Sequence, residues 1–170
     1  GMLEALPNLR LAEADTMNLW IDVARDDLAK LLKKVDGLVL NYEEAEQYAG
    51  TNNAVAAGKK MLEEGPTFVV IKKGEDGALL IHRDGLAALP AYPAAKVIDP
   101  TGAGDTFAAG MMAQIAKTGD RSFDGLRKAM AHGTVMASFT IETFSLERLA
   151  ALSAEQLQER YDDYAHMIAV

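Results

Sequence analysis

The sequence contains no cysteine among its 170 residues. A disulfide framework and a thiolate metal site are therefore excluded, and the composition fits the reducing cytoplasm, where we expect the protein to act. No apolar run reaches the roughly 18 residues that a membrane-spanning helix needs, so we expect no membrane segment. Basic residues are outnumbered, and the net charge is −8. A nucleic-acid-binding protein usually presents a basic face, so we expect no nucleic-acid partner.

The residues that are present predict an α/β fold. Apolar residues make up 49% of the chain, which is enough for a sizeable core. Short β-branched or apolar runs alternate with amphipathic stretches, a pattern typical of a largely parallel sheet flanked by helices. We predict strands over 9–14, 37–40, 67–72, 78–82 and 86–89, and helices over 27–35, 43–49, 53–64, 105–117 and 123–141. Ser153 and Gln156 form a capping-box pattern that predicts a final helix.

A glycine-rich stretch, V-I-D-P-T-G-A-G-D-T-F-A-A-G at residues 97–110, joins an apolar run to a predicted helix. Unpaired backbone N–H groups at a helix start attract anions, and glycine lets a phosphate approach them closely. An acid at this place, Asp105, can accept a proton from an alcohol that attacks the phosphate. Asp105 could instead be a simple helix cap, since glycine-rich turns before helices are common. The glycine spacing matches neither G-x-G-x-x-G nor G-x-x-x-x-G-K-[ST].

The segment D-P-T-G-A-G-D-T-F-A-A-G closely resembles the C-terminal motif of the PfkB (ribokinase-like) sugar and nucleoside kinases, D-T-x-G-A-G-D-x-F-x-x-G. The resemblance implies that Asp105 is the catalytic base and that the Gly102–Asp105 backbone forms an anion hole, lined by the N–H groups of Ala103, Gly104 and Asp105. It also implies that Asp99 and Thr101 lie at the phosphate end of the nucleotide site. Pro100 stands where threonine is frequent, and we expect this difference to leave the chemistry unchanged.

Two further segments carry the same resemblance. N-Y-E-E follows the predicted strand 37–40 and resembles the family's N-x-x-E motif, which implies that Asn41 and Glu44 help to hold Mg²⁺, largely through water. Mg²⁺ prefers oxygen ligands and keeps several waters, so the residue types suit it. The same residues also suit an asparagine helix cap with an acid in the first turn.

K-K-G-E-D-G follows the predicted strand 67–72, and its resemblance to the family implies that Lys72 or Lys73, beside Gly74, contacts the phosphates of ATP. A hairpin turn with solvated lysines is the alternative.

The remaining candidates are weaker. In the predicted helix 123–141, the family places part of the adenine pocket, which makes His132 and Gly133 candidate nucleotide contacts. Ala129, Gly133 and Ala137 share one helix face, however, and close helix packing explains them as well. Asp15 and Asn18 follow the first predicted strand, at the sheet edge where open parallel sheets bind ligands. A polar loop in which Asp15 starts a turn is the alternative.

The resemblance implies a three-layer ribokinase-like fold, ATP and Mg²⁺ as cofactors, and phosphoryl transfer to a hydroxyl of a small-molecule sugar or nucleoside. Family members are roughly twice this long. We therefore expect residues 1–170 to be a single partial domain, the C-terminal catalytic part, without the N-terminal half and lid and inactive alone. The alternatives are a non-catalytic nucleotide-binding fragment and a ribokinase-fold kinase of vitamin precursors. Exposed apolar edges lead us to expect self-association into a homo-oligomer.

Overall fold

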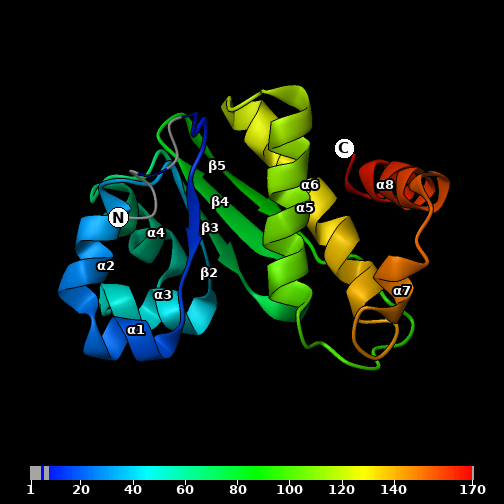
Figure 1. Ribbon diagram of the computed structural model, residues 1–170, viewed down its shortest axis with the longest axis horizontal. Helices are drawn as coiled ribbons and strands as arrows, with labels where there is room; N and C mark the ends of the chain where they lie inside the picture. The colour runs from blue at the N-terminus through cyan, green and yellow to red at the C-terminus, as the bar shows by residue number, and fades with distance from the viewer. Residues whose placement is uncertain (1–4, 6–7, 170) are drawn as a thin grey trace. The chain divides into compact units, whose positions relative to one another are not determined.

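The computed structural model describes residue 5 and residues 8–169 (Figure 1). Five strands form one mostly parallel sheet in the order β1-β2-β3-β4-β5, flanked by helices. The strands are β1 (Glu13–Asp15), β2 (Gly37–Asn41), β3 (Phe68–Lys72), β4 (Ala78–His82) and β5 (Gly85–Leu89). The helices are α1 (Asn18–Val23), α2 (Arg25–Leu32), α3 (Tyr42–Ala49), α4 (Ala54–Leu62), α5 (Ala103–Thr118), α6 (Phe123–Thr140), α7 (Glu147–Ala150) and α8 (Ala154–Ile168). The predicted α/β class is confirmed.

The chain divides into two compact units. The first comprises the described residues up to Lys73 together with Leu79–Ala87, and the second comprises Gly74–Ala78 and the described residues from Ala88 onward. Among the described residues, no helix combines the length and the apolar character that crossing a bilayer requires.

In the first unit, the register of the parallel strands decides which side chains share a face. Glu13 pairs with Gly37 and Asp15 with Val39, and Gly37 in turn pairs with Phe68. Because side chains alternate along a strand, Glu13 and Asp15 project from the same face. A Cβ on Gly37 would lie 2.1 Å from the Phe68 ring, so only glycine leaves room for this ring beside Glu13.

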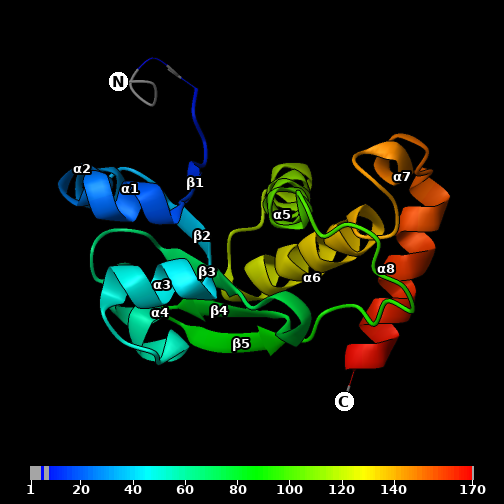
Figure 2. The same cartoon turned by 90° about the horizontal axis from the view of Figure 1, so that it is seen from below.

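The opposite face of these strands forms the core of the first unit with α1–α4. Leu38, Leu40, Val69 and Ile71 of the sheet are at most 1% exposed. They belong to one apolar cluster with residues from the four helices, among them Ile21, Leu32, Tyr48 and Met61. Figures 1 and 2 show α1–α4 gathered on this face. This packing fixes the ends of β1, β2 and β3, from which the candidate site residues project.

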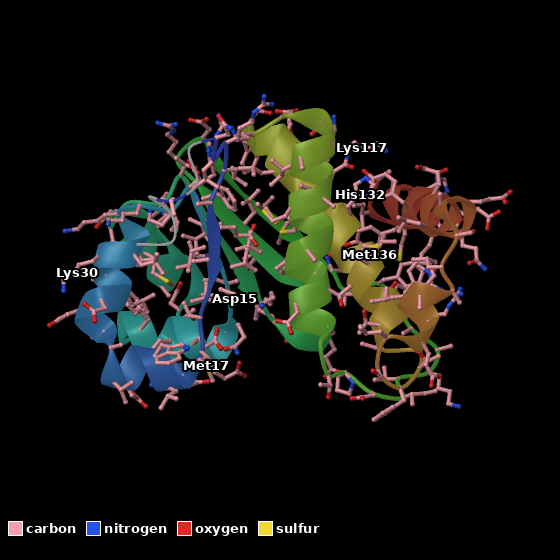
Figure 3. All side chains as sticks on the ribbon, in the orientation of Figure 1. Asp15, Met17, Lys30, Lys117, His132 and Met136 are labelled. Atoms are coloured by element: carbon pink, nitrogen blue, oxygen red, sulfur yellow. The ribbon has the colours of Figure 1, made fainter. Side chains whose placement is uncertain are left out.

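In the second unit, α5 packs closely against α6, which runs at an angle to it (Figure 1). Small residues allow the approach: a Cβ on Gly133 would lie 2.6 Å from the Phe107 carbonyl oxygen, and one on Gly110 would lie 2.9 Å from Met136 Cγ. Figure 3 labels Met136 and His132 on α6. The contact therefore depends on glycine in both helices.

Side chains of the last helix, α8, contact the end of α6 and the segment before the glycine-rich motif. Arg160 of α8 pairs with Glu142 at 2.7 Å and lies 3.5 Å from the centroid of the Phe139 ring. The Tyr164 hydroxyl donates to the Pro90 carbonyl at 2.6 Å. The Ile98 N–H donates to the Ile141 carbonyl at the end of α6. These contacts fix the position of residues 90–98, which form no strand and lead to Asp99.

The structure departs from the predicted elements in a few places. The first strand is Glu13–Asp15 rather than 9–14, since its pairing partner β2 begins only at Gly37. Residues Asn18–Val23, for which a polar loop was the alternative interpretation, form helix α1, which buries Ile21 in the core. The predicted capping box of Ser153 and Gln156 on α8 is confirmed. Ser122 caps α6, and Gly119 ends α5 in the left-handed conformation.

Candidate active site

In the first unit, the ends of β1, β2 and β3 bring together Asp15, Asn41 and Lys72. Asn41 and Lys72 are neighbours in the sheet register. The Lys72 ammonium pairs with Asp15 Oδ2 at 2.8 Å, and the Lys72 side chain is only 16% exposed. Asp15 lies at the end of β1 (Figure 3). The ion pair places Lys72 at the edge of the sheet where the sequence predicted a phosphate contact.

The second lysine of the predicted pair has a different environment. Lys73 Nζ lies 5.8 Å from the centroid of the Tyr42 ring, a cation–π arrangement at the start of α3. Gly74 begins a short 3₁₀ turn with φ of +57°, in the left-handed region that suits glycine. The segment for which a hairpin turn was the alternative interpretation thus forms a 3₁₀ turn that leads into β4.

Asn41 and Glu44 form a complete capping box at the start of α3. The Asn41 side chain accepts from the Glu44 N–H at 2.8 Å, and the Glu44 carboxylate accepts from the Asn41 N–H at 3.1 Å. Asn41 Nδ2 also donates to Glu44 Oε1 at 2.8 Å. The structure therefore contains the helix cap that was one interpretation of N-Y-E-E, and the predicted metal role remains a proposal beside it.

The Glu44 carboxylate is buried and held by three donors. Its third donor is the Thr16 hydroxyl, at 3.1 Å from Oε2. Glu44 is 5% exposed, and burial raises its pKa, while hydrogen bonds from Asn41 and Thr16 act in the opposite direction. These bonds leave Oε1 with one donor and a free lone pair, so the carboxylate is oriented but not saturated.

The donor set is compatible with a magnesium ion that keeps most of its waters. Within the described part of the chain, no group of three or more His, Cys, Asp or Glu side chains is arranged to hold a metal. Mg²⁺ is commonly bound by one or two carboxylates, with waters and substrate phosphates completing its coordination. The oriented carboxylate of Glu44, with the Asn41 amide oxygen, fits this mode.

In the second unit, the glycine-rich motif builds the first turn of α5. Gly102 occupies the N-cap position with φ of +79°, which explains the need for glycine there. Asp105 is in the first helical turn and is exposed. The first-turn N–H groups have no acceptor within the helix. Among the described residues, nothing accepts from the N–H groups of Gly104 and Asp105.

One predicted member of the anion hole is occupied. The Ala103 N–H donates to the Pro100 carbonyl at 3.1 Å, which closes the turn before α5. Proline fixes φ in this turn and brings its carbonyl to the start of the helix. Two amides of the three remain open in this structure, those of Gly104 and Asp105.

Asp99 and Thr101 shape the approach to this turn. The Thr101 N–H donates to Asp99 Oδ1 at 3.0 Å. This bond, followed by the one from the Thr101 hydroxyl, lowers the pKa of Asp99. The two residues thus hold the motif loop in an Asx turn, and their predicted contact with the nucleotide remains a proposal.

The structure places the two weaker candidates of α6 in packing contacts. The His132 ring stacks on the Tyr161 ring of α8 with centroids 3.9 Å apart. Burial, and the charge of Lys117, lower the His132 pKa. Gly133 lies against the Phe107 carbonyl, which accounts for its small size. Their predicted role as nucleotide contacts therefore stays a prediction.

Sequence reasoning missed two residues near the end of β1. One is Thr16, which bonds Glu44. The other is Glu13, whose Oε2 atom is buried without a hydrogen-bond partner among the described residues. Burial, reinforced by the charge of Asp15, raises the Glu13 pKa to about 7. Glu13 stands two residues before Asp15, and this strand periodicity was the signal that could have placed it on the same face.

Comparisons with known proteins identify the family of this chain. The sequence profile described as "pfkB family carbohydrate kinase" matches residues 9–150. The chain belongs to this family.

Among curated members of the family, a fructokinase from Klebsiella pneumoniae is 32% identical over 122 residues, which is 70% of this chain and 38% of the relative. The bifunctional ribokinase/ribose-5-phosphate isomerase A of Fructilactobacillus sanfranciscensis is 32% identical over 118 residues, covering 66% of this chain and 21% of the relative.

Solved structures of other kinases share the fold. The Methanocaldococcus jannaschii nucleoside kinase has a TM-score of 0.77 and 24% identity, covering 95% of this chain and 51% of that chain. The aminoimidazole riboside kinase of Salmonella enterica has a TM-score of 0.78 and 21% identity, covering 94% and 56%. The chain thus has a ribokinase-like fold and spans about half the length of these two kinases, and a smaller share of the curated relatives.

Proposed function

We propose that this chain is the nucleotide-binding and catalytic part of a longer kinase, which transfers the γ-phosphoryl group of ATP to a hydroxyl of a sugar or nucleoside. The observation that carries the proposal is the first turn of α5, where Asp105 stands beside open N–H groups after a glycine in the left-handed conformation. Membership of the pfkB family supports the reaction class.

Asp105 is the proposed base. It accepts the proton of the acceptor hydroxyl as that oxygen bonds to phosphorus and the bond to the β-phosphate oxygen breaks. The N–H groups of Gly104 and Asp105 stabilise negative charge on the transferring group, with the helix dipole adding to their effect. Gly102 provides the left-handed turn that leaves these groups open, and the Ala103 N–H, now bonded to Pro100, is a third donor only if that turn rearranges.

Residues of the first unit are proposed to bind the rest of the nucleotide. Lys72 neutralises phosphate charge, in preference to Lys73, because its side chain is held at the strand edge beside Asn41. Asn41 and Glu44 hold the waters of Mg²⁺, which offsets charge on the phosphate oxygens when bound. A sugar or nucleoside is the proposed small-molecule partner.

Substitution of Asp105 by asparagine in the longer kinase tests the proposal. We expect kcat to fall by orders of magnitude while ATP affinity changes little, because the amide keeps the shape but cannot accept the proton. Asp124→Asn is a matched control, since Asp124 also lies in the first turn of a helix, α6. An Asp105→Asn enzyme with near-normal turnover would remove Asp105 from the role.

The competing interpretation is that the 170-residue chain, by itself, binds a nucleotide without catalysis. We expect the 170-residue chain to bind ATP but to transfer no phosphoryl group at a rate near that of an intact kinase. A coupled assay of ADP release with a panel of sugars and nucleosides measures this. Full turnover by the chain alone would contradict the proposed division of roles.

A further inference from the structure

A series of hydrogen bonds, one of them from the Thr16 backbone N–H, connects the ends of β3 and β1 with the start of α3. Lys72 Nζ pairs with Asp15 Oδ2 at 2.8 Å. Asp15 Oδ1 accepts from the Thr16 N–H, also at 2.8 Å. The Thr16 hydroxyl then donates to Glu44 Oε2 at 3.1 Å. Of the four residues in this series, Thr16 alone has been given no role by the sequence or by the proposed reaction.

We propose that Thr16 is a positioning residue, whose hydroxyl orients the Glu44 carboxylate toward hydrated Mg²⁺. The inference rests on the proposed function, in which Glu44 holds waters of the ion. Thr16 itself touches neither the metal nor the nucleotide. It acts on Glu44 from outside the capping box, because its bond comes from the loop after β1 rather than from α3.

The Thr16 hydroxyl is the one donor to the Glu44 carboxylate that does not come from Asn41. Asn41 supplies both other donors, and Asn41 is itself a proposed ligand of the hydrated ion. Any adjustment of the Asn41 amide on ion binding would loosen one of these bonds. The Thr16 hydroxyl is independent of that amide, and together with the Asn41 backbone N–H it holds Oε2 in place while Oε1 keeps a free lone pair.

The backbone at Thr16 is fixed without the hydroxyl. Asp15 is paired in register with Val39 of β2. On the other side, Asn18 Nδ2 donates to Gln47 Oε1 of α3 at 2.6 Å. Loss of the hydroxyl therefore removes one hydrogen bond and leaves the main chain in position.

The side chain of Thr16 also tolerates an apolar replacement. It borders a small interior space lined otherwise by apolar and aromatic side chains, including Ile21, Leu38 and Tyr48. Valine has the shape of threonine, so Thr16→Val keeps the packing against this space. Thr16→Ser keeps the hydroxyl and removes the methyl group.

The first measurement tests the orientation of the Glu44 carboxylate and needs no nucleotide. In the amide spectrum of the ligand-free chain, the Asn41 side-chain NH₂ reports the bond to Glu44 Oε1. We expect Thr16→Val to shift these resonances toward those of a solvated amide, and Thr16→Ser to leave them near the wild-type positions. An unchanged Asn41 NH₂ signal in Thr16→Val overturns the proposal.

The second measurement is calorimetric titration of each chain with ATP in the presence of Mg²⁺ and in the presence of EDTA. We expect Thr16→Val to weaken the Mg²⁺-dependent affinity about tenfold, as for a lost hydrogen bond to a charged group, with affinity in EDTA unchanged. Thr16→Ser should restore affinity to within about twofold.

Thr67→Val is the matched control. The Thr67 hydroxyl donates to the Asp36 carbonyl at 2.9 Å, before β3, so this variant also loses one hydroxyl hydrogen bond in the first unit. It should leave both affinities unchanged.

The results distinguish a failure of the proposed function of Glu44 from a failure of the proposed role of Thr16. If the wild-type chain binds ATP equally with Mg²⁺ and with EDTA, or not at all, the proposed function of Glu44 fails and the role of Thr16 fails with it. If the wild type shows the Mg²⁺ dependence and Thr16→Val shows it unchanged, only the role of Thr16 is refuted. A loss of affinity in both Mg²⁺ and EDTA would mark Thr16 as merely structural, which also refutes the proposal.

Discussion

The buried carboxyl of Glu13 makes the stability of the first unit depend on pH. Its pKa rises from an ordinary 4.5 to about 7 on folding, mainly because burial disfavours the charged form. The folded state therefore holds a proton more tightly than the unfolded state. The contribution of Glu13 to stability is most favourable below about pH 4.5 and falls between about pH 4.5 and pH 7, and its loss is complete above about pH 7.

The size of the effect follows from the same values. The difference between 4.5 and about 7 corresponds to about 3 kcal/mol of unfolding free energy. This is a large share of the 5–15 kcal/mol that is typical of a domain, roughly a fifth to three fifths. Glu13→Gln keeps the size of the side chain and cannot ionise, so it should remove most of this pH dependence.

Urea unfolding at pH 5 and pH 8 tests the prediction. Trp20 is the only tryptophan and lies in α1 of the first unit, so its fluorescence reports the unfolding of the relevant part. We expect Glu13→Gln to be more stable than wild type at pH 8 by up to about 3 kcal/mol, and by much less at pH 5. Glu46→Gln, at an exposed position on α3, is the control and should follow the wild type. If wild type and Glu13→Gln respond equally to pH, the account of Glu13 is refuted.

Two other predictions concern the second unit. Gly133→Ala should lower stability by about 1–3 kcal/mol, because the new Cβ would lie 2.6 Å from the Phe107 carbonyl; a melting temperature equal to the wild type would contradict the packing account. Arg160→Lys should lower the unfolding free energy by about 1–2 kcal/mol despite keeping the charge, since an ammonium loses the planar stacking of the guanidinium on Phe139; chemical denaturation measures this, and a fully stable variant would show that the ion pair with Glu142 suffices.

Much of the fold could be predicted because its signals are local. Ser153 accepts from a backbone N–H at the start of α8, as its capping-box pattern with Gln156 indicated. Continuous apolar runs marked β2 and β3, whose residues are buried on both faces. The helix α1 was missed because its residues form no clear apolar stripe, and only Ile21 is buried.

The candidate site could be predicted only in part, because some of its contacts are between distant segments. The motif around Asp105 and the capping pattern of Asn41 and Glu44 are contiguous in the sequence. The bond from Thr16 to Glu44 joins residues 28 positions apart, and the ion pair of Asp15 with Lys72 joins residues 57 apart. Strand register sets these contacts, and no local pattern encodes it.

The amides at the start of α5 give the most direct test of the central claim. In a titration of the ¹⁵N-labelled chain with Mg²⁺ and ATP, we predict that the Gly104 and Asp105 N–H resonances shift in a saturable way, as donors to a phosphate do. The Gly125 N–H, which is already bonded to Ser122 at the start of α6, should stay in place. Saturable binding of ATP that leaves Gly104 and Asp105 unmoved would contradict the account.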